Sequence, residues 1–307
     1  MVFTTRRIDA VRCRESLKDL LLHSMPEDGD YPAEFCAMTF YRRSHVDTEH
    51  VPIFYDPVAI FLAQGEKSVR VGKKEYIYGG GSYFITGIDM PTACAVRGVS
   101  PDCPFLSLAL KLDRGLLAEL TAGLPPMTGD TVSFPRGAMI GRLDGEMLDA
   151  VLRLAELTAR TEHAPVLAPL TVREVHYRLL LGEFGPYLRA INAEGTPSNQ
   201  IARTIIWLKE HFQQPASVMN LARMSNMAPS TFHKHFKEMT AMSPLRFQKR
   251  LRLEYARRAM LTQGLDASSA ASAAGYESIQ QFGRDYKRLF GNPPRRDIAG
   301  MRRRTGG

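Results

Sequence analysis

Two segments near the carboxyl end of the chain carry polar side chains of the kinds that bind nucleic acids. The first reads LARMSNMAPSTFHKHFKEM from Leu221, and the second reads AASAAGYESIQQFGRDYKRLF from Ala270. Arg, Lys and Gln near the start of an exposed helix can reach base edges in the major groove, and hydroxyl groups and Lys can bond phosphates. We predict that nine side chains of these segments contact DNA: Ser230, Thr231, His233, Lys234, Lys237, Gln280, Gln281, Arg284 and Lys287.

The two segments are copies of one unit, which is predicted to be helix, tight turn, helix. Their first helices align at a spacing of 49 residues and their second helices at 50, so the second copy has one extra residue in its turn. Ala222 and Ala271 are small enough to let the two helices of each unit cross closely, and Gly275 supplies the second turn. Two aromatic pairs spaced i to i+4 are predicted to face the core: Phe232 with Phe236, and Phe282 with Tyr286.

The second helices of the two copies are expected to begin differently. The sequence SIQQ, which begins at Ser278, has the S-x-x-Q form of a capping box and predicts a helix that starts there. In the first copy Pro229 suits the first helical position, but Ala228 before it cannot cap. We therefore expect the first of these helices to start more loosely than the second.

A basic helix is predicted to join the two units. Pro244 opens the sequence LRFQKRLRLEYARRAML, which gives a helix of about 18 residues and about 27 Å. A rigid spacer of that size can hold two recognition helices about 34 Å apart, which is one turn of B-DNA. We predict a phosphate contact from Arg250 on this helix. The alternative is a solvated helix surface on which Arg250 pairs with Glu254.

The run from Leu221 to Arg296 resembles the DNA-binding domain of the AraC/XylS family of bacterial transcription regulators. The likeness lies in SPLRFQKRLRL, GYES, QFGRDYKRLFG and NPPRR, which occur in that order. It implies sequence-specific binding to double-stranded promoter or operator DNA, and activation by contact with RNA polymerase. The family usually has Gly where Ala241 stands, and Ser where Ala228 and Gly283 stand. By position, the resemblance implies base reading by Ser230, His233, Lys234, Gln280, Gln281 and Arg284.

The charge of the chain divides at a polar segment. Among 307 residues, 40 are Lys or Arg and 32 are Asp or Glu, which gives a net charge of +8. Residues 1–192 hold 21 basic and 24 acidic side chains, while residues 193–307 hold 19 and 8, so the second part carries +11. The segment 193–199, AEGTPSN, contains Gly and Pro and predicts a linker. We expect a sensor and dimerisation domain over 1–192 and a double helix-turn-helix domain over 200–307.

The first domain is predicted to begin with strands and to end with helices. From Phe35 to about Leu112, short apolar runs recur at roughly 8 to 12 residues, which is typical of an antiparallel β-sandwich or small barrel. Apolar residues at steps of three and four then predict helices up to Phe184. The expected fold class is therefore α+β, a cupin-like β-barrel or sandwich with helices followed by an all-α domain. The run VPIFYDPVAIFLAQGEKSVRVGKKEYIYGGGSYFITGIDMP also resembles the cupin-like amino-terminal domain of one AraC subgroup.

In regulators of this family such a domain often binds a small-molecule effector. In this chain, the predicted helices over 144–184 either cap the β-domain or form the surface of a homodimer. A barrel lined with aromatic residues could hold a small, partly apolar effector with a few polar anchors. For each lining residue the alternative is an ordinary place in the core. Cys94, or Cys103 in the next loop, could instead sense an aldehyde or an oxidant. The predicted effector contacts are Tyr55, Arg70, Tyr83, Met90 and Cys94.

The sequence argues against a metal site and against catalysis. A metal cupin needs closely spaced His residues on converging strands, but His45 and His50 precede the first long strand run and no later His follows in the strands. We expect no catalytic residue, no metal and no cofactor. The alternative is a cupin-type metalloenzyme tethered to nucleic acid. The four Cys show no CxxC, and neither a signal peptide nor a long apolar run is present, so we expect a cytoplasmic protein with no membrane partner.

Overall fold

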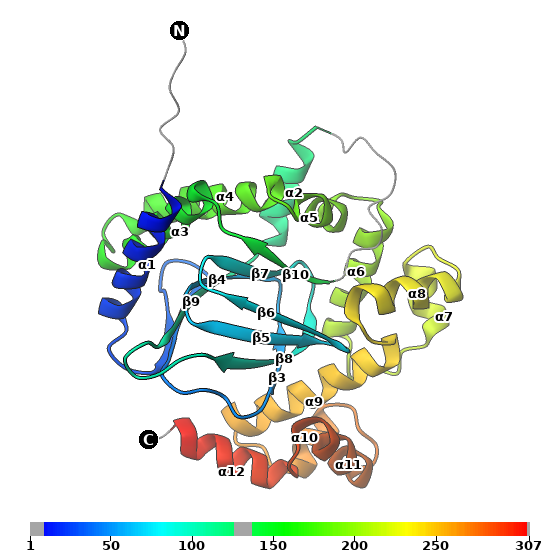
Figure 1. Ribbon diagram of the computed structural model, residues 1–307. Helices are drawn as coiled ribbons and strands as arrows, with labels where there is room; N and C mark the ends of the chain where they lie inside the picture. Colours follow the sequence, from blue (N-terminus) through cyan, green and yellow to red (C-terminus); the bar gives the residue numbers. More distant parts are fainter. Residues whose placement is uncertain (1–8, 126–136, 306–307) are drawn as a thin grey trace. The chain divides into compact units, whose positions relative to one another are not determined.

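The computed structural model describes residues 9–125 and 137–305 and divides into two compact units, Met1–Asn199 and Gln200–Gly307. The first unit is built on two antiparallel sheets (Figure 1), as predicted for a β-sandwich or barrel. The larger sheet consists, in spatial order, of β1 (Gly29–Pro32), β2 (Met38–Arg43), β9 (Phe105–Lys111), β4 (Val58–Gln64), β7 (Ser82–Thr86) and β10 (Ala138–Arg142). The smaller sheet consists of β3 (Val51–Tyr55), β8 (Met90–Arg97), β5 (Glu66–Val71) and β6 (Lys74–Gly79).

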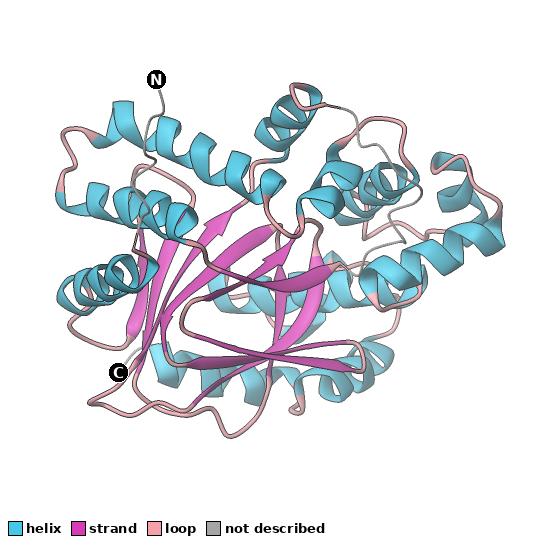
Figure 2. Cartoon of the chain, turned by 45° about the horizontal axis from the view of Figure 1, so that its top comes forward, coloured by secondary structure: helices cyan, strands magenta, loops and turns pink. Residues whose placement is uncertain are grey.

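Helices cover the outer face of the larger sheet. They are α1 (Ala10–Ser24), α2 (Arg114–Ala122), α3 (Gly145–Glu156), the short 3-10 helix η1 (Leu157–Ala159), α4 (Ala164–Leu181) and α5 (Gly185–Asn192). Most of them lie above the sheet in Figure 1 and outside the strands in Figure 2. Strand β4 is buried on both faces, because helix α1 packs on one side of the sheet and the sandwich interior lies on the other. This is why β4 reads as a continuous apolar run and not as an alternating one.

The linker is shorter than predicted. Helix α6 (Pro197–Glu210) begins inside the segment 193–199, so the residues from Pro197 onward are helical. Thr196 provides the start of this helix, since its Oγ1 accepts a hydrogen bond from the main-chain N–H of Asn199 at 3.1 Å. A Pro at the first helical position and a Thr before it are both typical of a helix N-terminus. The polar residues of the segment 193–199 therefore include the start of helix α6 as well as the connection before it.

Among the described residues of the second unit, every element of regular secondary structure is a helix. After α6 come α7 (Val218–Met224), α8 (Pro229–Thr240), α9 (Pro244–Thr262), α10 (Ala267–Ala273), α11 (Ile279–Phe290) and α12 (Pro294–Thr305). The predicted aromatic pairs, one on α8 and one on α11, are fully buried, as are the small residues Ala222 and Ala271. None of the helices in the described ranges has both the length and the hydropathy that crossing a membrane requires.

The two helix-turn-helix units differ in their turns as predicted. The first runs from the end of α7 to Pro229, and the second, one residue longer, runs from the end of α10 to Ile279. Both turns need one residue with a left-handed backbone, which is Asn226 (φ 50°) in the first and Gly275 (φ 79°) in the second. Asn and Gly are the residues that adopt this conformation at least cost. The duplicated sequence thus folds into duplicated structure.

Candidate functional site

The first predicted DNA-reading surface lies on α8. Phe232 and Phe236 are fully buried on one side of this helix, so its other side faces outward. Within the described residues, no side chain caps the first turn of α8, as predicted from Ala228. The five predicted contacts of this helix are exposed: Ser230, Thr231, His233, Lys234 and Lys237.

The second surface lies on α11, where side chains of the helix bond one another. Gln280, Arg284 and Lys287 are exposed as predicted. Arg284 Nη2 donates a hydrogen bond to Gln281 Oε1 at 2.8 Å, and Gln281 Nε2 donates one to Asp285 Oδ2 at 2.8 Å. Gln281, which was also predicted to face outward, is half-buried. In this arrangement the amide of Gln281 orients the guanidinium of Arg284.

Asp285 anchors these hydrogen bonds to the neighbouring helix. It is buried, and Lys249 Nζ of α9 lies 3.0 Å from its Oδ2 atom. Burial raises the pKa of Asp285, but the hydrogen bonds from Gln281 and Lys249 outweigh burial and leave the pKa below its ordinary value. The ionised carboxylate therefore ties α11 to α9. The sequence analysis missed this pair, although Gln281 and Asp285 are spaced i to i+4 on one helix.

The predicted phosphate contact from Arg250 is wrong, because this side chain lies in the core of the second unit. Only 7% of Arg250 is exposed, and its Nε donates to Glu254 Oε1 at 2.8 Å. The guanidinium also lies 5.8 Å from the centre of the Phe290 ring. Burial lowers the pKa of Arg250 and raises that of Glu254. The pairing considered as the alternative therefore exists, but it is buried between α9 and α11 instead of lying at the surface.

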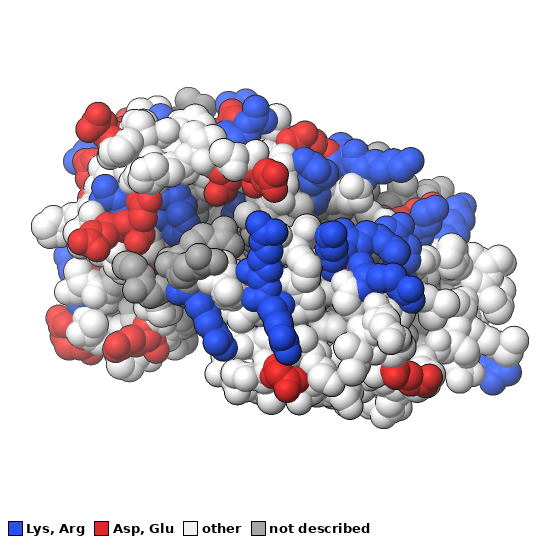
Figure 3. Space-filling model, turned by 90° about the horizontal axis from the view of Figure 1, so that it is seen from below, with Lys and Arg blue, Asp and Glu red and all other residues white. Residues whose placement is uncertain are grey.

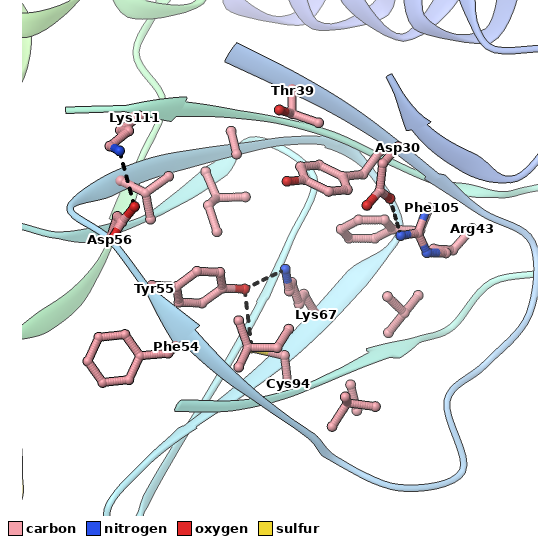
Figure 4. Close-up of a pocket in the computed structure, with 18 of the residues that line it drawn as sticks. Asp30, Thr39, Arg43, Phe54, Tyr55, Asp56, Lys67, Cys94, Phe105 and Lys111 are labelled. Carbon is pink, nitrogen blue, oxygen red and sulfur yellow. Dashed lines mark hydrogen bonds and ion pairs between the residues drawn. The ribbon is translucent and has the colours of Figure 1, made fainter. Parts of the chain in front are cut away.

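A cavity of about 600 Å³ opens between the two sheets of the first unit (Figure 4). A cavity of this volume suits a small organic ligand. Its walls come from β1, β2, β4 and β9 of the larger sheet and from β3, β5 and β8 of the smaller one. Of the five predicted effector contacts, Tyr55 and Cys94 lie in the wall, whereas Arg70, Tyr83 and Met90 do not.

The alternation of side chains along the strands explains why only two of the predicted effector contacts line the cavity. On β5, Lys67 points into the cavity, and Arg70 is exposed on the opposite face of the sheet. Tyr83 packs toward the helices, with its ring centre 6.2 Å from that of Phe184. Met90 is fully buried and is not among the residues that line the cavity. The sequence analysis did not predict Lys67. The one feature of the sequence that could have indicated a cavity residue is the position of this Lys in the inward-facing row of β5.

Lys67 lies at the centre of the polar contacts in the cavity. Its Nζ donates a hydrogen bond to Tyr55 Oη at 3.0 Å, and Tyr55 Oη lies 3.3 Å from Cys94 Sγ (Figure 4). The ammonium group also lies 5.6 Å from the Tyr55 ring centre and 5.8 Å from that of Phe105. Burial lowers the pKa of Lys67 and raises the pKa of Tyr55 well above its usual value.

The other cations of the cavity wall are already neutralised. Arg43 pairs with Asp30, and Lys111 Nζ lies 3.1 Å from Asp56 Oδ2. For Lys67, in contrast, the described residues place no carboxylate oxygen within 4.0 Å of Nζ. The cavity therefore contains one ammonium group that is bonded to a neutral hydroxyl and flanked by aromatic rings.

The two closely spaced histidines of the first unit, His45 and His50, have other partners. His45 is exposed, with Nδ1 3.6 Å from Asp28 Oδ2, and His50 Nε2 lies 2.7 Å from Ser68 Oγ. Among residues 9–125 and 137–305, no group of three or more His, Cys, Asp or Glu side chains is placed to hold a metal ion. Cys94 is buried and Cys103 is exposed, and both are free thiols.

Comparison with known proteins assigns both units to described families. The model for the AraC-type transcriptional regulator N-terminus matches residues 36–187, and a helix-turn-helix domain model matches residues 221–298. The HTH-type transcriptional activator RhaS of Escherichia fergusonii is 25% identical over 154 residues, which are 50% of this chain and 55% of RhaS. The probable transcriptional regulator LumQ of Photobacterium leiognathi is 28% identical over 90 residues, which are 29% of this chain and 36% of LumQ. The chain thus spans about half the length, or less, of these curated relatives.

A solved structure supports the fold of both units. Apo ToxT from Vibrio cholerae strain SCE256 gives a TM-score of 0.60 at 10% identity, covering 87% of this chain and 98% of ToxT. At that identity the likeness concerns the fold alone. The two family models, however, match the β-domain and both helix-turn-helix units in the same order in which the sequence analysis predicted them. The chain therefore belongs to the AraC family of transcriptional regulators.

Proposed function

We propose that this protein regulates transcription by binding double-stranded DNA through α8 and α11, and that it activates transcription by contact with RNA polymerase. The observation that carries the proposal is the duplicated helix-turn-helix unit, with its aromatic residues buried and its polar residues exposed on both second helices. The net charge of +11 in residues 193–307 favours binding to a polyanion. On the face drawn in Figure 3, Lys and Arg side chains gather with few Asp and Glu among them.

The first test separates sequence-specific from purely electrostatic binding. The affinity of the full chain for the duplex upstream of its own gene is measured against a shuffled duplex over a series of salt concentrations. Specific binding predicts tighter association with the first duplex, with a difference that persists as salt weakens both. Equal affinities at every salt concentration would refute sequence-specific regulation.

The second test separates base reading from phosphate contact on α11. Arg284 is oriented by Gln281, as expected of a side chain that reads a base, so Arg284→Ala should cost about 1–3 kcal/mol and relax specificity at one position. Lys287 is exposed one turn further along, and Lys287→Ala should weaken all duplexes alike. A uniform loss with Arg284→Ala would instead assign Arg284 to a phosphate.

We further propose that the cavity of the first unit binds the small-molecule effector. Its volume of about 600 Å³ and its aromatic and aliphatic walls support this role. The alternative of a thiol sensor predicts that Cys94→Ser together with Cys103→Ser abolishes induction. The alternative of a tethered metalloenzyme predicts stoichiometric Fe, Mn or Zn in the purified protein. Cys94 in the cavity wall gives the thiol alternative its one structural support.

We also propose that α4 pairs two copies of the chain. Five large apolar side chains on this helix are exposed, and they recur mainly at steps of three and four along one stripe: Val166, Leu167, Leu170, Tyr177 and Leu181. Apolar surface arranged in this way favours packing against another helix, and ion pairs beside the stripe offer both charges to a second copy. Leu170→Glu should convert a dimer into a monomer in sedimentation, and an unchanged dimer mass would exclude α4 as the interface.

A further inference from the structure

We propose that the cavity between the two sheets binds a ligand with a single carboxylate, held by Lys67 and Tyr55, and with an apolar body. This inference rests on the proposed function, in which the cavity takes the effector, and it names the chemical class of that effector. The sequence alone could not assign this role to Lys67, because the role depends on how β5 faces the other sheet.

Among the described residues, one cation of the cavity wall lacks a carboxylate within 4.0 Å. The ammonium group of Lys67 is flanked by the Tyr55 and Phe105 rings, and it donates a hydrogen bond to the neutral hydroxyl of Tyr55. A buried cation is stabilised by a counterion far more than by a hydroxyl group. The other two cations of the wall, Arg43 and Lys111, already have carboxylate partners. Asp47, the third carboxylate of the wall, accepts a hydrogen bond from the main-chain N–H of Val96 at 2.8 Å and lies beyond 4.0 Å of Lys67 Nζ. One ligand carboxylate would therefore give Lys67 the direct partner that Arg43 and Lys111 already have.

The hydrogen-bond donors around Nζ fit the two oxygens of a carboxylate. An ammonium group has three N–H donors, and the structure shows one of them on Tyr55 Oη. Tyr55 Oη lies 3.3 Å from Cys94 Sγ, where either group can donate, and a thiol is a weak hydrogen-bond partner in both roles. A carboxylate can accept one hydrogen bond from Lys67 and one from Tyr55, and for the hydroxyl it is a stronger partner than the thiol.

The rest of the wall is suited to an apolar body. Besides the aromatic rings, aliphatic side chains from both sheets line the cavity: Val51, Ile53, Val58, Ile60 and Ala109. Burying hydrocarbon against such a wall is favourable at roughly 25 cal/mol per Å² of apolar surface, so the body contributes affinity and the carboxylate contributes selectivity. The proposed class is a small aliphatic or arylalkyl monocarboxylate.

The experiment compares matched acids and amides on the full chain by isothermal titration calorimetry at pH 7. The probes are 4-phenylbutanoate and octanoate, each beside its primary amide, which keeps the size and removes the charge. In the wild type each acid should bind about tenfold tighter than its amide, or more, as expected for charge-assisted hydrogen bonds. The preference should fall to about onefold in Lys67→Met and persist in Lys67→Arg, which keeps the charge.

Two further variants control for nonspecific effects. Lys74→Met removes a lysine that also lies over a tyrosine ring, 4.6 Å from the Tyr76 ring centre, but it is exposed and lies outside the cavity. This variant should keep the full preference for acids. Tyr55→Phe keeps Lys67 and the ring but removes the hydroxyl, so it should reduce the preference severalfold even if Lys67→Met fails to fold.

The outcomes that overturn the carboxylate class are clear. They are equal binding of acid and amide by the wild type, no binding of either acid, or a preference that survives Lys67→Met. Control of DNA binding is read separately, from DNA affinity with and without the acid. If the acid binds through Lys67 but leaves the DNA affinity unchanged, the ligand class is supported and effector control is refuted. If the acid still changes transcription in Lys67→Met, effector control is supported and the ligand class is refuted.

Discussion

The ends of the two second helices make a reciprocal prediction about stability. Helix α8 is followed by Ala241 with φ 58°, and helix α11 is followed by Gly291 with φ 81°. An L side chain in this left-handed region destabilises the folded state by about 1–2 kcal/mol. A Gly, in contrast, loses more conformational entropy on folding than an Ala, which costs about 0.4–1 kcal/mol. The difference predicts that Ala241→Gly stabilises the second unit by roughly 0.5–1 kcal/mol and that Gly291→Ala destabilises it by as much.

The structure isolates the backbone effect at these two positions. A Cβ added at Gly291 would meet no atom of the described residues within 4 Å, so no clash adds to the strain. Gly275 differs, because a Cβ added there would lie 2.5 Å from the carbonyl oxygen of Gln213. This clash adds to the strain of a side chain at φ +79°. Gly275→Ala should therefore destabilise the protein clearly more than Gly291→Ala, by about 2 kcal/mol or more.

Urea denaturation at 25 °C with fluorescence detection measures these changes. Trp207 is the only tryptophan of the chain, and it lies in the second unit, stacked on His211 with ring centres 4.6 Å apart. Its emission therefore follows the unit in which the substitutions lie, and the midpoint should shift with an unchanged slope. A neutral or destabilising Ala241→Gly, with Gly291→Ala still costly, would refute the assignment of strain to Ala241. Equal costs for Gly275→Ala and Gly291→Ala would refute the close approach to Gln213.

Three further predictions concern a helix start, a buried histidine and a buried ion pair. Ser278 Oγ accepts a main-chain N–H at 3.3 Å at the start of α11, whereas α8 lacks such a cap among the described residues. Ala228→Ser should therefore stabilise the second unit, and Ser278→Ala should destabilise it. Each change should be about 1 kcal/mol in the same fluorescence assay. Burial lowers the pKa of His176, so the folded state disfavours its protonation and stability should fall as the pH drops below about 6.5. Circular dichroism melts at pH 7.5 and pH 5.5 test this. The His176→Gln variant should show a smaller difference in melting temperature between the two pH values than the wild type. Asp297 accepts hydrogen bonds from Arg257 at 2.9 and 3.1 Å in the core, so Asp297→Ala should cost about 3–5 kcal/mol in urea, and a loss below about 1 kcal/mol would refute the importance of the pair.

Local patterns in the sequence predicted much of the fold. Aromatic residues at i and i+4, such as Phe232 with Phe236, define the buried face of a helix without reference to any other segment. Turn residues and caps act within a few positions, so Gly275 and Ser278 could be assigned their roles directly. The duplicated unit, the basic half of the chain and the family resemblance all follow from such local information.

The tertiary structure decided which of these local faces are covered, and by what. Arg250 looks like a surface residue in sequence, but Phe290, forty residues later, packs near it and buries it. Lys67 and Arg70 are both basic residues of one strand, and only the pairing of two sheets shows that Lys67 faces the cavity and Arg70 faces outward. The period of a helix or strand determines the faces of one element. The partner of each face comes from segments distant in the chain, and therefore only the three-dimensional structure reveals the cavity around Lys67 and the anchoring of Arg284.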